Sequence, residues 1–437
     1  MGAALKPLLK RLAVGSPAAL PTLDLDFLAQ SYKVSDGAGG MNSVAFADLI
    51  TFTRSSAAWR FNASGVLEQV PANQPRFDYD PVTLELRGLL VEEQRTNLLL
   101  NSVLAGGTAG TNSGEAVPPT GWQLGFAGSG GVVGYPAVYG LTGLRTAAAS
   151  SSERPFIARS VTLSANTNYV ASARVSAVVG AVPVGAIIRW DNLPGGNSQS
   201  GLLVNGVSVP ATTNVAVGDV IAAVVSINAT GGNGFARFGM GANGNQLVPG
   251  DVTLVACNAE VGLFPTSYIP TTSAQVTRAA DVASVNTLSP WFNPNEGTLF
   301  VDAVAAGLPV GTAAMCSVSL TSGASINERL LALQFGSTYF RAGGVGSGGI
   351  DTAVLTMAGA PVAGTNYRAA IAFGLNDARG AVNGTPSSQD TSTPVPAVTT
   401  MNIGRLGVSN QPFNGHIRRI RYWPRRLFDN ELQRITA

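Results

Sequence analysis

The chain carries little charge for its length. Of its 437 residues, 12% are Asp, Glu, Lys or Arg, about half of the roughly 25% that is usual in globular proteins. Its three lysines all lie near the start, at Lys6, Lys10 and Lys33, so Arg supplies the other positive charges. A net charge of only +2 argues against binding to duplex DNA, which needs a strongly basic surface. The low charge also argues against a helical bundle, whose surface is normally built from Glu, Lys and Arg.

Histidine and cysteine are almost absent. The chain has one histidine, His416, and two cysteines, Cys257 and Cys316. A structural zinc site built from His and Cys takes four such ligands, and the chain has only three, so one chain cannot supply it. The alternating segment FNGHIRRIRYW predicts that His416 is a strand residue and not a catalytic base. The cysteines stand among apolar and small residues, which predicts buried free thiols and leaves a disulfide open.

No apolar run is long enough to cross a membrane as a helix, which takes about 18 residues or more. Residues 1–19 instead predict a short amphipathic helix, which either docks on a partner or folds against its own domain. Basic residues interrupt its apolar stretch at Lys6, Lys10 and Arg11. This pattern differs from a secretory signal, in which positive charge precedes the apolar core.

What the sequence does contain is typical of β-structure. The 52 glycines and a 45% hydrophobic content, with many Val, Thr, Ser and Asn residues, suit short strands joined by tight turns. In LDLDFLA, Leu and Phe alternate with Asp, and AAWRFNASGVLEQV predicts a hairpin that turns at residues 62–65. We therefore predict a mainly β protein with an N-terminal helix, a small β module and two β-sandwich domains. The boundaries are 1–19 for the helix, 20–100 for the module, 101–120 for a linker or long loop, 121–275 for the first sandwich and 276–437 for the second.

Three consecutive blocks in the opening module resemble a known family. TFTRSSAAWRFNASGVLE, NQPRFDYDPVT and GLLVEEQRTNLLLNS are similar to a module of tail-fibre, baseplate and head-spike proteins of tailed bacteriophages and prophages. The phrase FPTSYIPTTSAQVTRAADV, residues 264–282, is also typical of such proteins. The resemblance implies a component of the virion surface and a homotrimer, and it supplies no catalytic residue.

Residues 121–275 and 276–437 carry looser resemblances. The first segment resembles carbohydrate-binding-module sandwiches of jelly-roll type. The second resembles a concanavalin A-like, laminin-G-type lectin sandwich, through GTLFVDAVA, AVNGT, NIGR and FNGHIRRIRYWPRRLFDNEL. Lectins of this type often bind sugars, some of them through calcium. This chain shows no acidic cluster that would hold calcium, so we expect no cofactor.

Two pairs of acidic residues in the opening module raise the question of a glycosidase. Such an enzyme needs two carboxyl groups around the sugar bond. Glu92 and Glu93 are adjacent, and neighbouring strand residues point to opposite faces. Asp78 and Asp80 lie in DYDP, which is a turn sequence. We therefore expect these acids to be structural and to form ion pairs with Arg76, Arg87 and Arg95.

Sugars bind to proteins by stacking on aromatic rings and bonding to polar side chains. Trp190, Asp191 and Asn192 precede a glycine-rich loop in IIRWDNLPGG and are the leading candidates, although a strand Trp can equally fill the core. The other candidates, each of which could instead be a core or solvated loop residue, are Trp122, Tyr139, Tyr339, Arg341 and Asn410.

The C-terminal arginines either bind anionic polysaccharide or pair with acids of the same or another subunit. They are Arg418, Arg419, Arg421, Arg425 and Arg426.

Together these observations predict a virion protein that binds host surface glycans as a receptor-binding adhesin. The alternatives are a decoration or scaffold protein without glycan affinity and a polysaccharide depolymerase. The expected partners are other virion proteins and host polysaccharide, with no nucleic acid.

Overall fold

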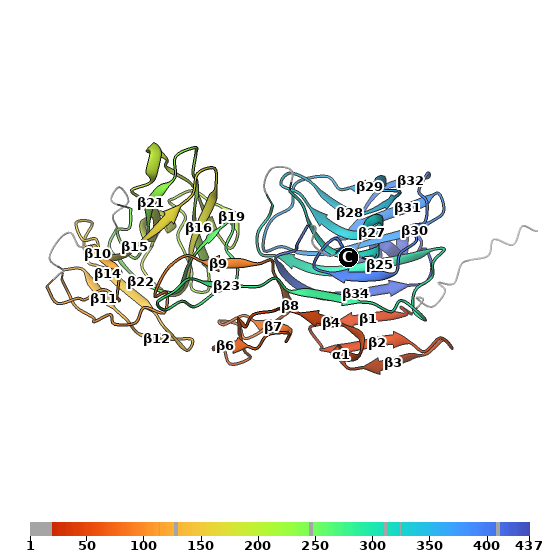
Figure 1. Ribbon diagram of the computed structural model, residues 1–437, viewed down its shortest axis with the longest axis horizontal. Helices are drawn as coiled ribbons and strands as arrows, with labels where there is room; N and C mark the ends of the chain where they lie inside the picture. Colours follow the sequence, from red (N-terminus) through yellow and green to blue (C-terminus); the bar gives the residue numbers. More distant parts are fainter. Residues whose placement is uncertain are drawn as a thin grey trace, which may run out of the picture.

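The computed structural model of the chain describes residues 20–112, 114–125, 130–243, 248–309, 313–323, 325–407 and 411–437. The described part is mainly β, as predicted, and it forms two bodies that lie side by side in Figure 1. The helix predicted over residues 1–19 lies outside the described residues. No helix within the described ranges is long and apolar enough to cross a membrane.

The larger body is a sandwich of two sheets. Its first sheet has ten strands, with β3, β2, β1, β34, β25, β30, β31 and β32 in that order and β7 attached through β8, which pairs with β34. These strands are β1 (Leu23–Asp26), β2 (Ser31–Ser35), β3 (Met41–Val44), β7 (Arg76–Tyr79), β8 (Leu86–Val91), β25 (Gly297–Ala305), β30 (Asn366–Gly374), β31 (Asp377–Val382), β32 (Thr385–Asp390) and β34 (Gly415–Trp423).

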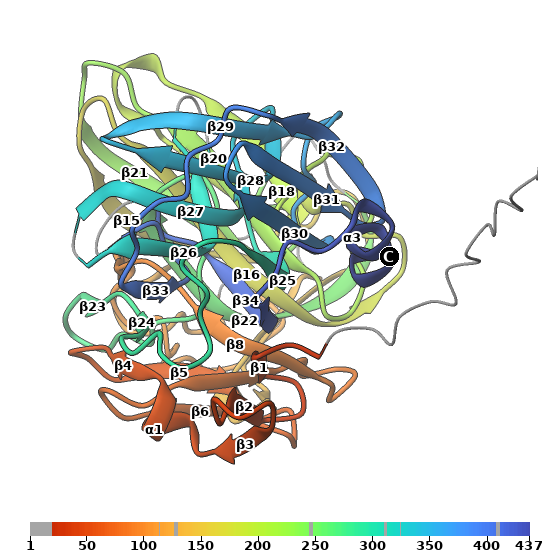
Figure 2. The same ribbon diagram turned by 90° about the vertical axis from the view of Figure 1, so that its right-hand side faces the viewer.

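The second sheet of this body has seven strands, ordered β29-β28-β27-β26-β33-β24-β4. They are β4 (Thr51–Thr53), β24 (Val282–Val285), β26 (Met315–Ser322), β27 (Ser325–Phe335), β28 (Phe340–Ser347), β29 (Ile350–Thr356) and β33 (Thr400–Ile403). Two short helices complete the body, α1 (Phe46–Leu49) and the C-terminal α3 (Asp429–Thr436), which lies against β30 and β31 (Figure 2).

The opening module is built into this sandwich and does not stand apart from it. β1 lies between β2 and β34, and β4 forms the edge of the second sheet. Leu23 and Leu25 point into the shared core with no exposure, as their alternation predicted. On the opposite face Asp24 accepts hydrogen bonds from Arg419 (2.8 and 2.6 Å). The first strand of the module is therefore held by the C-terminal strand β34, about 400 residues later in the chain.

The predicted hairpin forms from β5 (Ala58–Phe61) and β6 (Leu67–Val70). Asn62 and Gly65 close its turn, since the backbone N–H of Gly65 donates to the carbonyl oxygen of Asn62 (2.9 Å). Gly65 has φ +71°, and a Cβ there would lie 2.8 Å from the carbonyl oxygen of Pro81. Only glycine fits this turn without strain.

The second body is also a sandwich of two sheets. Its larger sheet runs β11-β14-β22-β16-β20-β18-β19 and its smaller sheet runs β10-β15-β21-β17. The strands are β10 (Gln123–Gly125), β11 (Val132–Gly134), β14 (Leu144–Ala148), β15 (Phe156–Leu163), β16 (Asn168–Val179), β17 (Ile188–Asp191), β18 (Gln199–Val204), β19 (Val207–Ser208), β20 (Val220–Ser226), β21 (Gly232–Phe238) and β22 (Gly250–Val261). A hairpin of β12 (Ala137–Val138) and β13 (Leu141–Thr142), a turn of helix α2 (Val184–Ile187) and a 3₁₀ turn η1 (Pro194–Gly196) are attached to it.

The segment 101–120 is a long loop packed on this second body and not a free linker. Leu104 and Ala116 are buried in its core. The side-chain amide of Asn101 donates to the carbonyl oxygens of Ala105 and Thr120 (both 3.0 Å). Its Gly- and Ser-rich composition indicated flexibility, but the two apolar residues and the Asn side chain fix the loop.

A two-stranded ribbon joins the two bodies. It consists of β9 (Arg95–Asn97) and β23 (Val276–Arg278), which run antiparallel between the sandwiches in Figure 1. A small cluster of Phe61, Leu67 and Tyr268 adds apolar contact between the β5–β6 hairpin and the second body. The chain therefore enters and leaves the second sandwich at one place.

Candidate functional site

A groove lies on the outer face of the smaller sheet of the second body. It has a volume of about 220 Å³, somewhat below the roughly 300–1,000 Å³ of pockets for drug-sized ligands, so it suits one ring of a longer chain. The residues that line it are Gln123, Leu124, Gly125, Phe156, Ala158, Asn192, Phe235 and Arg237.

Strand alternation creates the groove. Along β21, Ala236 and Phe238 point into the core, so Phe235 and Arg237 point outward. In β15 the same alternation turns Phe156 outward next to the core residue Ile157. Partly exposed aromatic rings therefore stand on two neighbouring strands.

Small residues keep the space between these side chains open. Ala158 lies opposite Arg237 on β21 and opposite Gln123 on β10. Gly125 lies opposite Phe156, and a Cβ on Gly125 would come within 2.2 Å of the Phe156 ring. A larger side chain at either position would fill the groove.

Arg237 is the central charged group of the groove. Its guanidinium lies over the Phe156 ring, 4.9 Å from the centroid, and forms an ion pair with Asp191. Asp191 also faces Arg189 at 3.5 Å, and Arg189 bonds to the side chain of Asn243. Burial lowers the pKa of Arg237, Asp191 opposes this shift and Arg189 adds to it. Two guanidinium groups thus share one carboxylate on this face.

The groove can therefore hold a sugar through contacts of two kinds. Phe235 and Phe156 provide apolar surface for the C–H face of a ring. Arg237, Asn192 and Gln123 provide donors and acceptors for hydroxyl groups. None of these residues forms a catalytic carboxylate pair.

The structure bears out the core alternative for Trp190. Its side chain is 1% exposed, and its indole N–H donates to the carbonyl oxygen of Ala223 (2.9 Å). It cannot stack on a sugar, because β17 turns it into the sandwich while Asp191 points outward. Trp122 is also buried, at 5% exposed, and its indole N–H donates to the carbonyl oxygen of Asn101 (3.0 Å). Both rings are thus core residues, and neither presents a ring face to the groove.

Asn192 is an exposed residue of the groove, and Asp191 positions Arg237 in it. Tyr139 lies away from the groove, with its ring packed edge-on against Phe61 at 5.9 Å. The sequence analysis thus located Asp191 and Asn192 beside the groove. The aromatic rings that face the groove are those of Phe156 and Phe235 and not that of Trp190.

Tyr339 and Arg341 meet in the other body. The Arg341 guanidinium lies 4.9 Å from the Tyr339 ring centroid and donates to the side-chain oxygen of Gln334 (2.8 Å). They form a partly exposed polar cluster, separate from the groove. Asn410 lies outside the described residues.

Sequence reasoning missed Phe156, Phe235 and Arg237. The signal for two of them was present in GFARFGM, where Phe235 and Arg237 alternate with Ala236 and Phe238. The alternation does not say which of the two sets is the outer one. The packing of this sheet against the larger sheet decides it, because Ala236 and Phe238 join the core between the two sheets.

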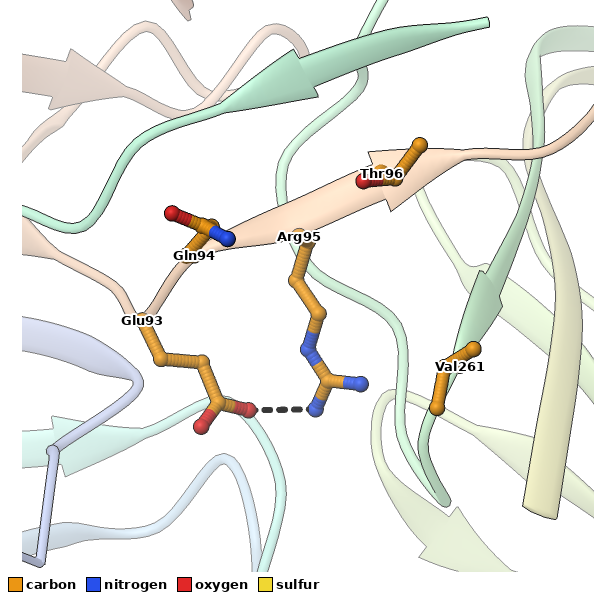
Figure 3. A pocket seen from close by; sticks show the side chains of 5 residues that line it. All are labelled: Glu93, Gln94, Arg95, Thr96 and Val261. Atoms are coloured by element: carbon orange, nitrogen blue, oxygen red, sulfur yellow. Dashed lines mark hydrogen bonds and ion pairs between the residues drawn. The ribbon is translucent and has the colours of Figure 1, made fainter. Parts of the chain in front are cut away.

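A second cavity, of about 260 Å³, lies beside the ribbon between the two bodies (Figure 3). Glu93, Gln94, Arg95 and Thr96 line one side and Val261 the other. Figure 3 shows Arg95 and Glu93 turned toward each other, joined by an ion pair. Arg95 also lies over the Phe264 ring, 5.3 Å from its centroid. With its charges paired, this cavity is better explained as part of the junction than as a binding site.

Next to this cavity is a buried ionic network. Glu92 accepts hydrogen bonds from Arg76 (2.8 Å) and Arg278 (2.6 Å), and Asp281 accepts them from Arg76 (2.5 Å) and Arg54 (3.0 Å). All five side chains are at most 4% exposed. The structural interpretation of the module's carboxylates is confirmed here, and also by the pairs Glu93–Arg95 and Asp80–Arg87 (3.9 Å).

We expect acid to weaken this network. Burial alone would raise the pKa of Glu92, but Arg278, Arg76 and Ser267 together lower it to about 2. Glu92 therefore stabilises the fold fully above pH 4.5 and loses this contribution as pH falls toward 2, in total about 3 kcal/mol. This contribution is measured by urea unfolding of the parent protein and of Glu92→Gln at several pH values between 7 and 2.5. The variant's unfolding free energy should fall less steeply, and equal slopes would contradict the assignment.

The C-terminal arginines pair with acids of the same chain. Arg419 contacts Asp24 (2.6 Å), Arg425 contacts Glu431 (2.7 Å) and Arg418 lies 3.9 Å from Asp302. Arg426 contacts Asp377 (3.0 Å). Of the two interpretations of this cluster, pairing with nearby acids is confirmed.

The scarce residues behave as predicted. Cys257 and Cys316 are free and buried, and burial raises the pKa of both thiols to about 12, so neither is reactive near neutral pH. His416 lies in strand β34 and bonds to Asp78 (3.0 Å). Burial lowers the pKa of His416, and the bond to Asp78 opposes this. Among the described residues no group of His, Cys, Asp and Glu is arranged to hold a metal ion.

Comparisons with known proteins add little. No family model matches the chain, and no curated protein matches it. Several solved structures resemble parts of it. The carbohydrate-binding module CBM40 of the Ruminococcus gnavus IT-sialidase, bound to α2,3-sialyllactose, is 16% identical, with a TM-score of 0.28 over 33% of this chain and 84% of that one.

Two further structures are similarly distant. The heptameric SAP-like pentraxin from Limulus polyphemus is 12% identical, with a TM-score of 0.25 over 33% of this chain and 70% of that one. The Trypanosoma rangeli sialidase in complex with the inhibitor DANA is 10% identical, with a TM-score of 0.28 over 77% of this chain and 55% of that one. Because the scores are so low, we base no functional argument on these likenesses and argue function from the chain's own residues.

Proposed function

We propose that the protein is a receptor-binding adhesin on the surface of a tailed-phage or prophage virion, and that it binds host surface glycans in the groove of the second body. The observation that carries the glycan part is the partly exposed pair Phe156 and Phe235 with Arg237 between them. Apolar rings next to polar donors in a shallow groove are what a protein uses to bind a sugar without cleaving it. The virion part rests on the three sequence blocks of the opening module and on their resemblance to phage proteins.

The arrangement of the two bodies supports this role. The opening strands are tied into the C-terminal sandwich, while the groove lies on the second body, which is joined through the β9–β23 ribbon and the small cluster of Phe61, Leu67 and Tyr268. One body can thus hold the particle or the other subunits of a homotrimer while the other presents the groove. A scaffold protein without glycan affinity is the second candidate, because the ion-paired surface of the larger body would serve assembly equally well.

The test is a titration of purified protein with polysaccharide from a susceptible host, with the polymer length recorded in the same samples. Saturable binding with unchanged length is expected. No binding would overturn the glycan part and favour the scaffold. Shortened polymer would mean an enzyme and contradict the proposal.

Phe235→Ala should weaken this binding roughly five- to tenfold, because it removes one stacking surface. Phe235 lies on the outer face of its strand, so the fold should tolerate the change. Val179→Ala is the matched control, since Val179 is a 68% exposed apolar residue of the other sheet. Equal affinities for the two variants, measured by calorimetry, would move the site away from the groove.

A further inference from the structure

The charges around the groove are unbalanced. On the outer face Arg189 and Arg237 share the carboxylate of Asp191 as their acidic partner. This leaves one positive charge in excess at the groove, in a chain whose net charge is only +2. A neutral sugar could accept a hydrogen bond from this guanidinium, but only a negatively charged ligand would also balance its charge.

The hydrogen-bonding capacity of Arg237 is also incompletely used. A guanidinium carries five N–H donors. One terminal nitrogen, Nη2, pairs with Asp191, and the other, Nη1, reaches the carbonyl oxygen of Ala242 only at 3.5 Å. Nε is buried and has no partner among the described residues. Nη1 is therefore left with a long, weak bond on a side chain that is 27% exposed.

The position of Arg237 is fixed before any ligand arrives. The Phe156 ring supports the guanidinium from one side and Asp191 from another. A charged donor that is already oriented loses little conformational entropy on binding, so it discriminates well between ligands. It lines the same groove as Phe235 and Asn192.

From this charge excess we infer that the groove selects an acidic saccharide, a sugar ring that carries a carboxylate. The carboxylate would accept a hydrogen bond from Arg237, the ring would lie against Phe235, and a hydroxyl group would bond to Asn192. This inference rests on the proposed glycan-binding function and adds the chemical class of the ligand.

The experiment is an array of bacterial surface oligosaccharides in which each carboxylate-bearing glycan is printed beside its carboxyl-reduced form. The full chain is applied at low and at physiological salt. We expect binding to the acidic forms, at least tenfold weaker binding to the reduced forms, and a decrease with salt. Equal binding to both forms would overturn the inference and leave the proposed function intact. No binding to any glycan would overturn both.

Two variants separate charge from shape. Arg237→Gln should weaken binding to the acidic glycan roughly ten- to hundredfold and weaken binding to the reduced form much less, because the reduced form loses only a hydrogen bond and no charge contact. Asp191→Asn should strengthen binding to the acidic glycan, because it removes the competing carboxylate while the Phe156 ring still supports Arg237. A purely structural role of this pair predicts that both variants lose affinity for both forms, and that result would contradict the inference.

Discussion

Replacing Asp281 by Asn is expected to lower the free energy of unfolding by about 3–5 kcal/mol, the usual cost of breaking a buried ion pair. The Asp281 carboxylate accepts hydrogen bonds from Arg54 (3.0 Å), from Arg76 (2.5 Å) and from the backbone N–H of Glu92 (3.0 Å). The side chains of Asp281, Arg54 and Arg76 are fully buried. A neutral amide would leave three buried guanidinium groups, those of Arg54, Arg76 and Arg278, with one carboxylate, that of Glu92.

The position of Asp281 in the chain makes the effect large. Arg54 and Arg76 belong to the opening module, while Asp281 follows the ribbon strand β23 that returns from the second body. Arg405 also donates to the backbone oxygen of Asp281 (3.0 Å). The network therefore fastens four distant segments of the chain at the junction, and its loss should loosen the larger body.

Asp251→Asn is the control for this experiment. Asp251 pairs with Arg145 (2.6 Å), but these side chains are 24% and 48% exposed. Water screens such a pair, so its loss should cost less than about 1 kcal/mol. Urea unfolding followed by tryptophan fluorescence compares the two variants. If they were destabilised equally, burial would not be what makes the network strong.

The sequence contained enough information for the local elements but not for their partners. The alternation of Leu23, Asp24 and Leu25 identified a strand and its buried face. It could not show that this strand pairs with β34, because nothing local in a strand specifies a partner 400 residues away. The opening module therefore looked independent, although its strands complete both sheets of the C-terminal sandwich.

The C-terminal strand shows a similar limit. Ile417, Ile420 and Tyr422 all point into the core, although Ile417 and Ile420 are three positions apart and simple alternation would place them on opposite faces. The structure explains the spacing by a bulge at Arg418, since Asp302 pairs with Arg419 and the next residue, Ala303, pairs with Ile417. A bulge adds one unpaired residue to a strand. With this extra residue, Ile420 and Tyr422 face the core on the same side as Ile417.

The candidate site was only partly predictable for the same reason. The sequence pointed to the end of β17, where Asp191 and Asn192 are indeed part of the groove or its support. It placed the ring contribution on Trp190 because Trp190 stands beside Asp191 and Asn192, just before a glycine-rich loop. Which face of β17 is covered depends on the larger sheet, whose Ala223 accepts the Trp190 N–H bond.

Trp190→Ala and Phe235→Ala should therefore have opposite consequences. Removing the Trp190 ring leaves a cavity beside Tyr169, whose ring centroid lies 6.4 Å away, and removes the hydrogen bond to the carbonyl oxygen of Ala223. This should lower the free energy of unfolding of the second body by about 3–5 kcal/mol, as measured by urea unfolding. Phe235 lies in the groove on the outer face of its sheet, so its loss should cost much less stability.

For glycan affinity the order should be reversed: Phe235→Ala should lose affinity and Trp190→Ala should keep it. The folded fraction of Trp190→Ala keeps the groove, so its dissociation constant should match that of the parent once the unfolded fraction is subtracted. Phe235→Ala should stay folded and bind more weakly. A folded Trp190→Ala protein that had lost its affinity would mean that sugar reaches the core tryptophan or depends on it. If the apparent affinity of Trp190→Ala falls only in proportion to its unfolded fraction, Trp190 acts in the core. The side chains of the outer face then recognise the sugar.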